Sequence, residues 1–470
     1  MNLIVVNVVT FQHKNVHNSL QNLILLSIFV RLTKAKPMEQ QSLFKEFETN
    51  SLDEWKKKIV KDLKGKDYEE TLVWKDENGI EHQPIYASEN TANNDLIKAI
   101  QAAQKKSTHW GNVQLYDGSD ENAVEKVTEG LKNGIDFAFV KNTTNFKPFI
   151  QARPKGKKIY FFLNEIDTSL LPKRFLVDPI KDLLKHKPGA EKNLAALKSL
   201  FQERLNDLKP DHFLMVDGSL YKEAGATIVQ ELAFTLSHAV EYFDKMTNEG
   251  FTADAIARSF IFKMGYGNSY FSEIAKGRAF HYLVDQLYQQ YKTKHRIVIW
   301  GEASNYYQAH KDAHTNLLRL SSQTMSAVLG NCNLVSLPAF DALEKASSLG
   351  MRMSRNIPLI LKEESSFEHV RDASNGSFYI ENLSAELATK AWELFRKVEK
   401  KGGLLAYFES GKLKEKLDKS HFNRLEKYNS KERTFLGVNK FENPNAIELQ
   451  VNQRHAGGIA ARVLSKEMNA

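Results

Sequence analysis

The stretch "VDGSLYKEAGATIVQELAF", Val216 to Phe234, runs from an apolar strand through a short turn into a helix. The turn places Ser219, Leu220 and Tyr221 at the junction of strand and helix. In a (β/α)8 barrel such a junction lies at the carboxyl end of the strands, where barrel enzymes carry their catalytic side chains. The stretch therefore predicts an α/β fold, and its turn is the first place to look for a site.

Strand-like runs and amphipathic helices alternate on both sides of this stretch. The strand candidates are Val113–Tyr116, Phe137–Val140, Lys158–Leu163, Phe213–Val216, Ser259–Met264, Ile297–Trp300 and Asn333–Leu337. Seven strands that alternate with helices favour a parallel sheet, and their spacing fits a (β/α)8 barrel of the TIM type with one strand undetected. A doubly wound open sheet is the alternative fold.

An N-terminal arm is predicted ahead of the barrel. Ser51, with Glu54 three residues later, forms the pattern of a capping box for a helix that ends near Leu63 and carries an apolar stripe. The segment "ETLVWKDENGIEHQPIYA" alternates around Asn78-Gly79, which predicts a short hairpin. About 50 residues with so little apolar content make a poor core, so we expect an arm rather than a domain.

The overall composition is that of an ordinary globular protein. With 42% hydrophobic residues among 470, the chain can bury a large core. The 65 basic residues are interspersed with 57 acidic ones, so the net charge of +8 predicts a solvated surface and no nucleic-acid binding. Cys332 is the only cysteine, which excludes a disulfide within the chain and fits a reducing cytoplasm.

The first residues do not predict a membrane span. The apolar run "LQNLILLSIFV", Leu20 to Val30, is shorter than the roughly 20 residues that a spanning helix needs. As a signal peptide it would lie late in the chain and lack a clear cleavage site. We interpret Met38 as the natural start and residues 1–37 as a non-native upstream extension or a disordered leader.

Two short segments resemble ligand-binding motifs incompletely. In "GYGNSY", Gly265 to Tyr270, a tyrosine stands where a dinucleotide fingerprint needs its third glycine, so a tight turn between strand and helix is the better interpretation. In "DAHTNL", Asp312 to Leu317, a leucine replaces the glycine of D-x-H-x-x-G, the loop by which some corrinoid enzymes give a histidine to cobalt. The polar start of a helix accounts for that segment better than cobalt ligation does.

The remaining residues offer no evident catalytic set. His238 lies in an apolar helix and is interpreted as a packed or surface histidine rather than a base. The sequence contains neither G-x-S-x-G nor G-x-x-x-x-G-K-[ST], and no Cys/His spacing suits a zinc site. The residues by themselves therefore predict a barrel-like α/β protein whose chemistry is not apparent.

Several blocks of the chain, in order, carry a family resemblance. They are "LKGKDYEETLVWKDENGIEHQPIY", "YKEAGATIVQELAFTLSHAVEY", "GNSYFSEIAKGRAF", "QTMSAVLGNCN", "RMSRNIPLILKEESSFEHVRDASNGSFYIENLSAELATKAWELFRKVEKKGG" and "FLGVNKF". The block from Arg352 to Gly403 is the most specific, because barrel propensity does not explain "SRNIPLILKEES" followed by "GSFYIE". On these blocks the chain resembles the methylmalonyl-CoA mutase family over most of Leu63 to Phe441.

The resemblance implies a radical rearrangement that interconverts methylmalonyl-CoA and succinyl-CoA. Adenosylcobalamin supplies the radical in this family, so the protein holds, shields and orients the reactants. In catalytic chains the substrate threads through an N-terminal barrel, and a C-terminal flavodoxin-like domain presents the cobalt. The present chain ends at Ala470, soon after "FLGVNKF", so we expect it to carry no cobalamin-binding domain.

The resemblance also implies that the barrel has lost its working residues. Aligned through Glu223 to Ala226, the histidine that contacts the substrate thioester in catalytic chains falls on Leu220, which cannot form a side-chain hydrogen bond. The arginine and serine of an R-L-S unit fall on Ser259 and Ile261. The segment with the radical-shielding tyrosine has no counterpart. We therefore expect no catalytic, cofactor-binding or metal-binding residue on this chain.

These losses imply a non-catalytic small subunit of a heterodimeric, cytoplasmic mutase. Its large subunit would bind the acyl-CoA and adenosylcobalamin, with no nucleic acid or membrane involved. We expect residues 38–95 to wrap the partner, 96–440 to form the barrel with its helical end, its centre filled by leucine and isoleucine, and 441–470 to form a tail. The alternatives are an acyl-CoA-binding catalytic subunit whose cobalamin domain is on a separate chain, and a barrel that binds acyl-CoA for regulation.

Overall fold

The computed structural model describes residues 51–90, 94–205, 212–446, 448–451 and 458–468. The extension that we expected at residues 1–37 and the apolar run at 20–30 lie outside them. The chain divides into two compact units, Met1–Lys66 and Asp67–Ala470. Among the described residues, no helix combines the length and the hydrophobicity that a bilayer span requires.

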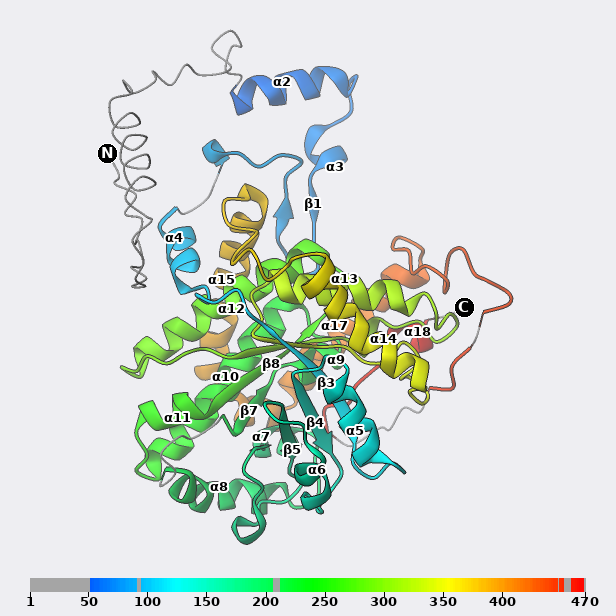
Figure 1. Cartoon of the computed structure of the whole chain (residues 1–470). Coiled ribbons are helices and arrows are strands. Elements are labelled where there is room, and N and C mark those ends of the chain that lie inside the picture. Colours follow the sequence, from blue (N-terminus) through cyan, green and yellow to red (C-terminus); the bar gives the residue numbers. More distant parts are fainter. Residues whose placement is uncertain (1–50, 91–93, 206–211, 447, 452–457, 469–470) are drawn as a thin grey trace, which may run out of the picture. The chain divides into compact units, whose positions relative to one another are not determined.

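Eight parallel strands form a barrel in the larger unit (Figure 1). They are β3 (Gly111–Asp117), β4 (Phe137–Lys141), β5 (Lys158–Phe162), β6 (Phe175–Leu176), β7 (Leu214–Asp217), β8 (Phe260–Tyr266), β9 (Ile299–Ala303) and β10 (Leu334–Ser336). Their order is β6-β5-β4-β3-β10-β9-β8-β7, and a parallel bridge between Val177 and Leu214 joins the two ends. The (β/α)8 barrel is confirmed, and the open sheet is wrong because closure removes both free edges.

The strand that the sequence pattern missed is β6. It contains only Phe175 and Leu176, too few residues to show an alternation of apolar and polar side chains. The backbone of Val177 completes its pairing, because the Val177 amide donates to the Phe213 carbonyl at 3.0 Å and its carbonyl accepts from the Met215 amide at 2.9 Å. The other seven predicted strands overlap β3, β4, β5, β7, β8, β9 and β10.

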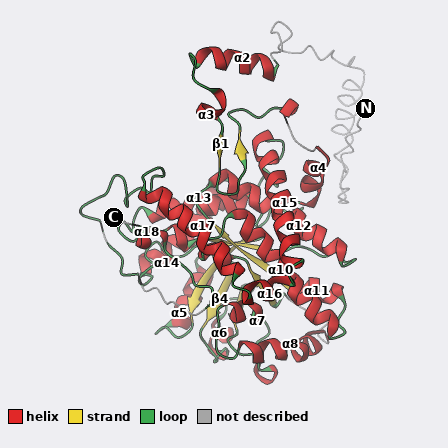
Figure 2. Ribbon diagram, turned by 180° about the vertical axis from the view of Figure 1, so that it is seen from behind, coloured by secondary structure: helices red, strands yellow, loops and turns green. Residues whose placement is uncertain are grey.

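Helices surround the strands on the outside of the barrel (Figure 2). The α-helices of the larger unit are α3 (Tyr68–Leu72), α4 (Asn94–Ala103), α5 (Ala123–Lys132), α6 (Lys147–Ala152), α7 (Pro179–Leu184), α8 (Ala190–Leu205), α9 (Ser219–Glu223), α10 (Ile228–Asn248), α11 (Ala253–Ser259), α12 (Tyr270–Gln290), α13 (Asn316–Leu329), α14 (Ser348–Leu359), α15 (Phe378–Glu399), α16 (Gly403–Glu409), α17 (Lys412–Asn429) and α18 (Leu464–Glu467). Short helical turns lie at Ser88–Asn90, Thr168–Leu170, Asn305–Tyr307 and, as a π-helix, Ile360–Glu364.

The long helices α10, α12 and α15 pack against one another. Helix α10 begins at a capping box, in which Thr227 accepts from the Gln230 amide and the Gln230 side chain accepts from the Thr227 amide. Its side chains, including Leu232 and Leu236, are buried almost all the way round, which is the pattern of a core helix rather than a surface helix. This packing fixes the turn that precedes α10, where the first candidate site residues lie.

The predicted hairpin is confirmed in the larger unit. Strands β1 (Trp74–Lys75) and β2 (Glu81–His82) pair antiparallel, and Gly79 in their turn has a φ of +73°. The turn is attached to the barrel, because the Val229 amide at the start of α10 donates to Asn78 Oδ1 at 3.1 Å. A salt bridge of 2.8 Å between Arg424 and Glu77 adds a second connection.

The predicted N-terminal helix is also confirmed, as α2 (Leu52–Asp62) in the smaller unit. Ser51 and Glu54 form both hydrogen bonds of the capping box. The apolar stripe exists, yet no residue of α2 is buried. A helix whose apolar side chains remain accessible gains little from tertiary packing.

Candidate functional site

Aromatic side chains fill the axis of the barrel. Phe139 and Trp300 are completely buried, and their ring centroids lie 4.7 Å apart in an edge-to-face arrangement. Phe162 adds a third ring, 5.9 Å from Phe139 and 6.2 Å from Trp300. Ile261, Leu176 and Met215 belong to the same cluster. We expected leucine and isoleucine here, and Leu176 and Ile261 do belong to the cluster, together with aromatic rings from three strands.

Charged side chains close the carboxyl end of this interior in pairs. Lys263 on β8 lies 2.5 Å from Glu302 on β9, and its Nζ lies 4.6 Å from the centre of the Trp300 ring. Lys181 donates to Asp217 at the end of β7 at 2.6 Å. Although burial opposes it, the charges of Lys181 and Lys263 hold the pKa of Asp217 well below its ordinary value. Each of these charges is compensated by a neighbour in the protein.

Leu220 lies in α9, directly after β7, and is 6% exposed. Tyr221 beside it directs its hydroxyl to His238 Nδ1 at 3.2 Å, while His238 Nε2 contacts Asp178 Oδ1 at 2.9 Å. The Tyr242 hydroxyl donates to the same carboxylate oxygen at 2.7 Å. His238 is therefore the packed histidine that we expected, and it connects α9, α10 and the start of α7.

Ser259 and Ile261 lie at the other end of the barrel from Leu220. Ser259 ends α11, and its hydroxyl donates to the Ile256 carbonyl at 2.7 Å. Ile261 is the second residue of β8 and belongs to the apolar cluster on the axis. Strand β8 runs seven residues, and each residue advances about 3.3 Å. The structure therefore does not bring these three positions together into one constellation.

The two incomplete motifs have structural explanations. A Cβ on Gly265 would lie 2.8 Å from the Lys222 side chain, so this glycine permits a close approach at the end of β8. Asp312 accepts from the Thr315 amide at 3.3 Å, one residue before α13 begins. His314 is exposed and its ring stacks on Phe340 at 5.4 Å. The polar helix start is thus what the structure shows for this segment.

A buried network of four charges was missed by sequence reasoning. Lys222 on α9 donates to Glu273 on α12 at 2.7 Å, and Lys276 lies 2.5 Å from Glu273 and 3.0 Å from Glu231 on α10. None of these side chains is more than 2% exposed. Despite burial, Lys222 and Lys276 lower the pKa of Glu273 to about 2. The only sequence signal is charge within otherwise apolar helices.

The segment Gly458–Met468 crosses the loops at the carboxyl end of the barrel. The Ile459 amide donates to the Leu184 carbonyl and the Arg462 amide to the Glu223 carbonyl, both at 2.8 Å. Farther along, the His310 amide donates to Ser465 Oγ at 3.1 Å. The barrel residues in these hydrogen bonds are Leu184, Glu223 and His310, which follow β6, β7 and β9 in the chain. Within the predicted tail, the segment Gly458–Met468 is thus packed against these loops, whereas Phe441 is 72% exposed.

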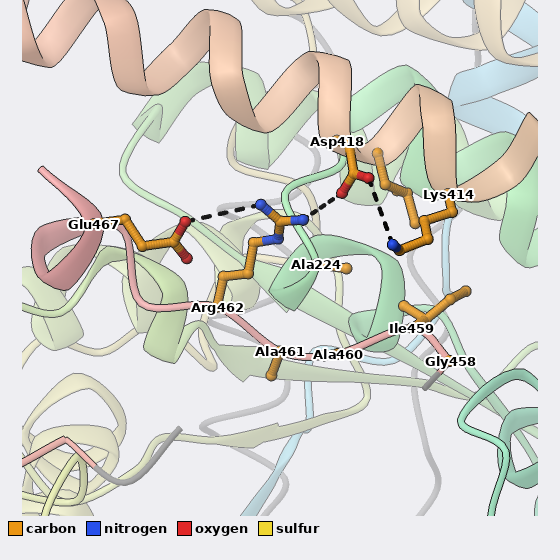
Figure 3. Close-up of a pocket in the computed structure, with 10 residues that line it drawn as sticks. Ala224, Lys414, Asp418, Gly458, Ile459, Ala460, Ala461, Arg462 and Glu467 are labelled. Carbon is orange, nitrogen blue, oxygen red and sulfur yellow. Dashed lines mark hydrogen bonds and ion pairs between the residues drawn. The ribbon is translucent and has the colours of Figure 1, made fainter. Parts of the chain in front are cut away.

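A cleft of about 330 Å³ lies between this segment and α17 (Figure 3). Arg462 reaches across it, paired with Asp418 on α17 and with Glu467 at 3.8 Å. Lys414 lies 4.0 Å from Asp418. The remaining wall is uncharged, and half of its residues are alanines, including Ala224 next to the candidate turn. The cleft lies outside the barrel axis and presents paired charges, so it has no evident catalytic group.

Glu223→Gln should remove one pH dependence of stability. Burial and the nearby charge of Glu302 raise the pKa of Glu223 to about 7 from its ordinary 4.5. The folded chain therefore holds a proton that the unfolded chain releases, so this group's contribution to stability is full below pH 4.5 and is lost as the pH rises through about 7. We expect the difference in urea midpoint, variant minus wild type, to be larger at about pH 8 than at about pH 5, because only the wild-type chain loses this contribution as the pH rises.

A matched control is Glu121→Gln, since Glu121 is exposed in a loop. Its urea midpoint should keep the same difference from wild type at both pH values. A constant difference for Glu223→Gln as well would show that the Glu223 carboxyl titrates alike in the folded and unfolded chain.

The sequence profile of the methylmalonyl-CoA mutase family matches residues 190–464. The chain belongs to this family. The matched region of this mutase-family chain contains β7 to β10, the turn with Leu220, and the first part of the segment that crosses the carboxyl end, Gly458–Leu464. Family membership therefore rests on the half of the barrel that contains Leu220, Ser259 and Ile261.

Individual relatives agree with this assignment. The methylmalonyl-CoA mutase small subunit of Porphyromonas gingivalis is 28% identical over 444 residues, which cover 86% of this chain and 72% of that protein. The methylmalonyl-CoA mutase of Rhizobium meliloti is 30% identical over 55% of this chain, and the large subunit of Propionibacterium freudenreichii is 30% identical over 48%. The mutase-family chain spans only 37% and 32% of those two relatives.

Proposed function

We propose that this chain is the non-catalytic small subunit of a heterodimeric methylmalonyl-CoA mutase. The large subunit would carry out the isomerisation of methylmalonyl-CoA and succinyl-CoA with adenosylcobalamin. The observation that carries the proposal is the filled barrel axis, where Phe139, Phe162 and Trp300 occupy the space along which an acyl-CoA would have to pass. Leu220 in place of a hydrogen-bonding histidine supports it.

The described residues of this chain do not fit a cobalamin. The segment nearest to the cobalt-binding motif has Leu317 instead of glycine, and its Asp312 bonds Thr315 rather than orienting His314. No group of three or more His, Cys, Asp or Glu side chains suited to a metal occurs in the part of the chain that the structure describes. We propose that the partner holds the cofactor, and we assign no step of the reaction to residues of this chain.

A pairing of related chains is supported by the names of two relatives. Porphyromonas gingivalis has a methylmalonyl-CoA mutase small subunit, 28% identical to this chain, and a large subunit, 26% identical over 56% of this chain. We propose that this chain pairs with such a large subunit in the cytoplasm. In that pair residues 38–95 would be the arm that contacts the partner. Residues 96–440 would form the barrel scaffold, and 441–470 would form its tail.

The purified chain alone should neither turn over methylmalonyl-CoA nor release saturable heat when titrated with it in a calorimeter. Co-expressed with the large subunit of the same organism, it should form a stable pair that isomerises methylmalonyl-CoA when adenosylcobalamin is present. Leu220→His should create no activity in the isolated chain, because a histidine there does not open the axis beside Trp300.

Three outcomes would contradict the proposal. Turnover by the isolated chain would make it an enzyme in its own right. Isomerisation by the chain mixed with a separate cobalamin protein would instead support the acyl-CoA-binding catalytic subunit. Saturable binding of a CoA ester without turnover would favour the regulatory barrel.

A further inference from the structure

Aromatic side chains from three elements surround a second cleft of about 210 Å³. Trp74 comes from the hairpin, Tyr270 and Phe271 from the first turn of α12, and Tyr379 from the first turn of α15. Trp74 and Phe271 are each 51% exposed. These four residues are called the aromatic cleft. Large rings exposed together in this way are uncommon on a monomer and are typical of protein interfaces.

The rings of the aromatic cleft are held in place from behind. Trp74 stacks face to face on His82, with centroids 3.9 Å apart and ring planes 5° apart. His82 is 2% exposed, and its Nδ1 lies 3.1 Å from the Tyr379 hydroxyl. The rings of Phe271 and Tyr379 pack edge to face, with centroids 5.8 Å apart. Rings that are already ordered lose little conformational entropy when a partner covers them.

The charged side chains in the wall of the cleft already have partners within the protein. Lys222 is paired with Glu273 at 2.7 Å, and Asp76 with His82 at 3.4 Å. Glu77 is shared by Arg424 at 2.8 Å and by Arg433 at 4.0 Å. A charged ligand would have to compete with these contacts and would lose its own hydration. The surface left for contact is aromatic, so the cleft fits an uncharged apolar group.

We propose that the aromatic cleft receives an apolar side chain of the large subunit. This inference rests on the proposed function and adds to it the surface that makes the contact. The cleft is smaller than the roughly 300–1,000 Å³ of ordinary small-molecule pockets, and half-exposed Trp74 and Phe271 extend beyond it, as suits a broad protein surface. Trp74 also belongs to residues 38–95, which we expect to contact the partner.

The test compares four variants of the full chain in binding to the large subunit of the same organism. Trp74→Ala and Phe271→Ala should each raise the dissociation constant, measured by calorimetry, at least about tenfold, because aromatic side chains at the centre of an interface dominate its affinity. Phe441→Ala and Leu318→Ala remove apolar side chains that are 72% and 71% exposed elsewhere. Those two substitutions should change the dissociation constant less than about threefold.

Three readouts separate the outcomes. If the wild-type chain does not bind the large subunit, the proposed function fails. If it binds and both aromatic variants, with unchanged melting temperatures, bind equally well, the proposed function stands and the inference is overturned. If sedimentation of the chain alone shows a self-associated form that only the aromatic variants lose, while binding to the large subunit is unchanged, a second copy occupies the cleft and the inference is also overturned.

Discussion

Trp300→Ala should lower the free energy of unfolding by about 3–5 kcal/mol. Trp300 is completely buried on the barrel axis, where it contacts the Phe139 ring at 4.7 Å. Its Nε1 donates to Ser336 Oγ at 2.8 Å, and Lys263 Nζ lies 4.6 Å from its ring. Alanine would leave a cavity between strands that cannot collapse without breaking the sheet. It would also remove a hydrogen-bond partner from Ser336 and a ring from beneath Lys263.

The free energy is measured by urea unfolding, followed by far-ultraviolet circular dichroism. Phe441→Ala is the control, because Phe441 is 72% exposed and its loss should change the free energy by less than about 0.5 kcal/mol. An equally small effect for Trp300→Ala would mean that the axis is loosely packed. In that case the main support for a non-catalytic barrel would be lost, and binding of an acyl-CoA would have to be reconsidered.

Lys276→Met should cost about 3–5 kcal/mol, because it removes one partner from a buried charge network. Lys276 is completely buried between Glu231 and Glu273, at 3.0 and 2.5 Å. Without it, two carboxylates would remain buried with Lys222 as the nearest compensating charge. The loss of stability arises from leaving buried charges uncompensated rather than from the net stabilisation that the ion pairs provide.

The double variant Lys276→Met with Glu231→Gln tests that reason, since it removes one of the two stranded charges. It should recover part of the lost stability, so the two substitutions should be less than additive. Lys126→Met breaks a pair with Asp120 whose side chains are 51% and 47% exposed, and it should cost less than about 1 kcal/mol. Strictly additive effects in the double variant would show that the four charges do not act as a network.

Most of the architecture could be predicted from local patterns. The hairpin follows from Asn78-Gly79 between alternating residues, and seven strands follow from short apolar runs. Strand β6 could not be predicted, since two residues carry no period. The buried charge network could not be predicted either. A lysine such as Lys276 ordinarily indicates the solvent side of a helix, and only the packing of α10 against α12 turns it inward.

The three candidate site positions remain a prediction. Leu220, Ser259 and Ile261 were identified from a resemblance between aligned blocks, which requires only the order of residues along the chain. Their separation was not foreseen. Leu220 follows β7 at the carboxyl end of the barrel, whereas Ser259 and Ile261 lie at the start of β8, at the opposite end. The aromatic cleft was likewise not foreseen, since Trp74, Phe271 and Tyr379 meet only after three distant segments have packed.

The sequence by itself determined the class of fold and the family, because strand and helix periodicity and the family blocks are properties of consecutive residues. Only the tertiary structure decided what fills the barrel. Phe139, Phe162 and Trp300 lie far apart in the chain and point toward the same axis only when the strands pair in register and the bridge from Val177 to Leu214 closes the sheet. Side-chain direction alternates along a strand, so closure and register decide which residues face inward.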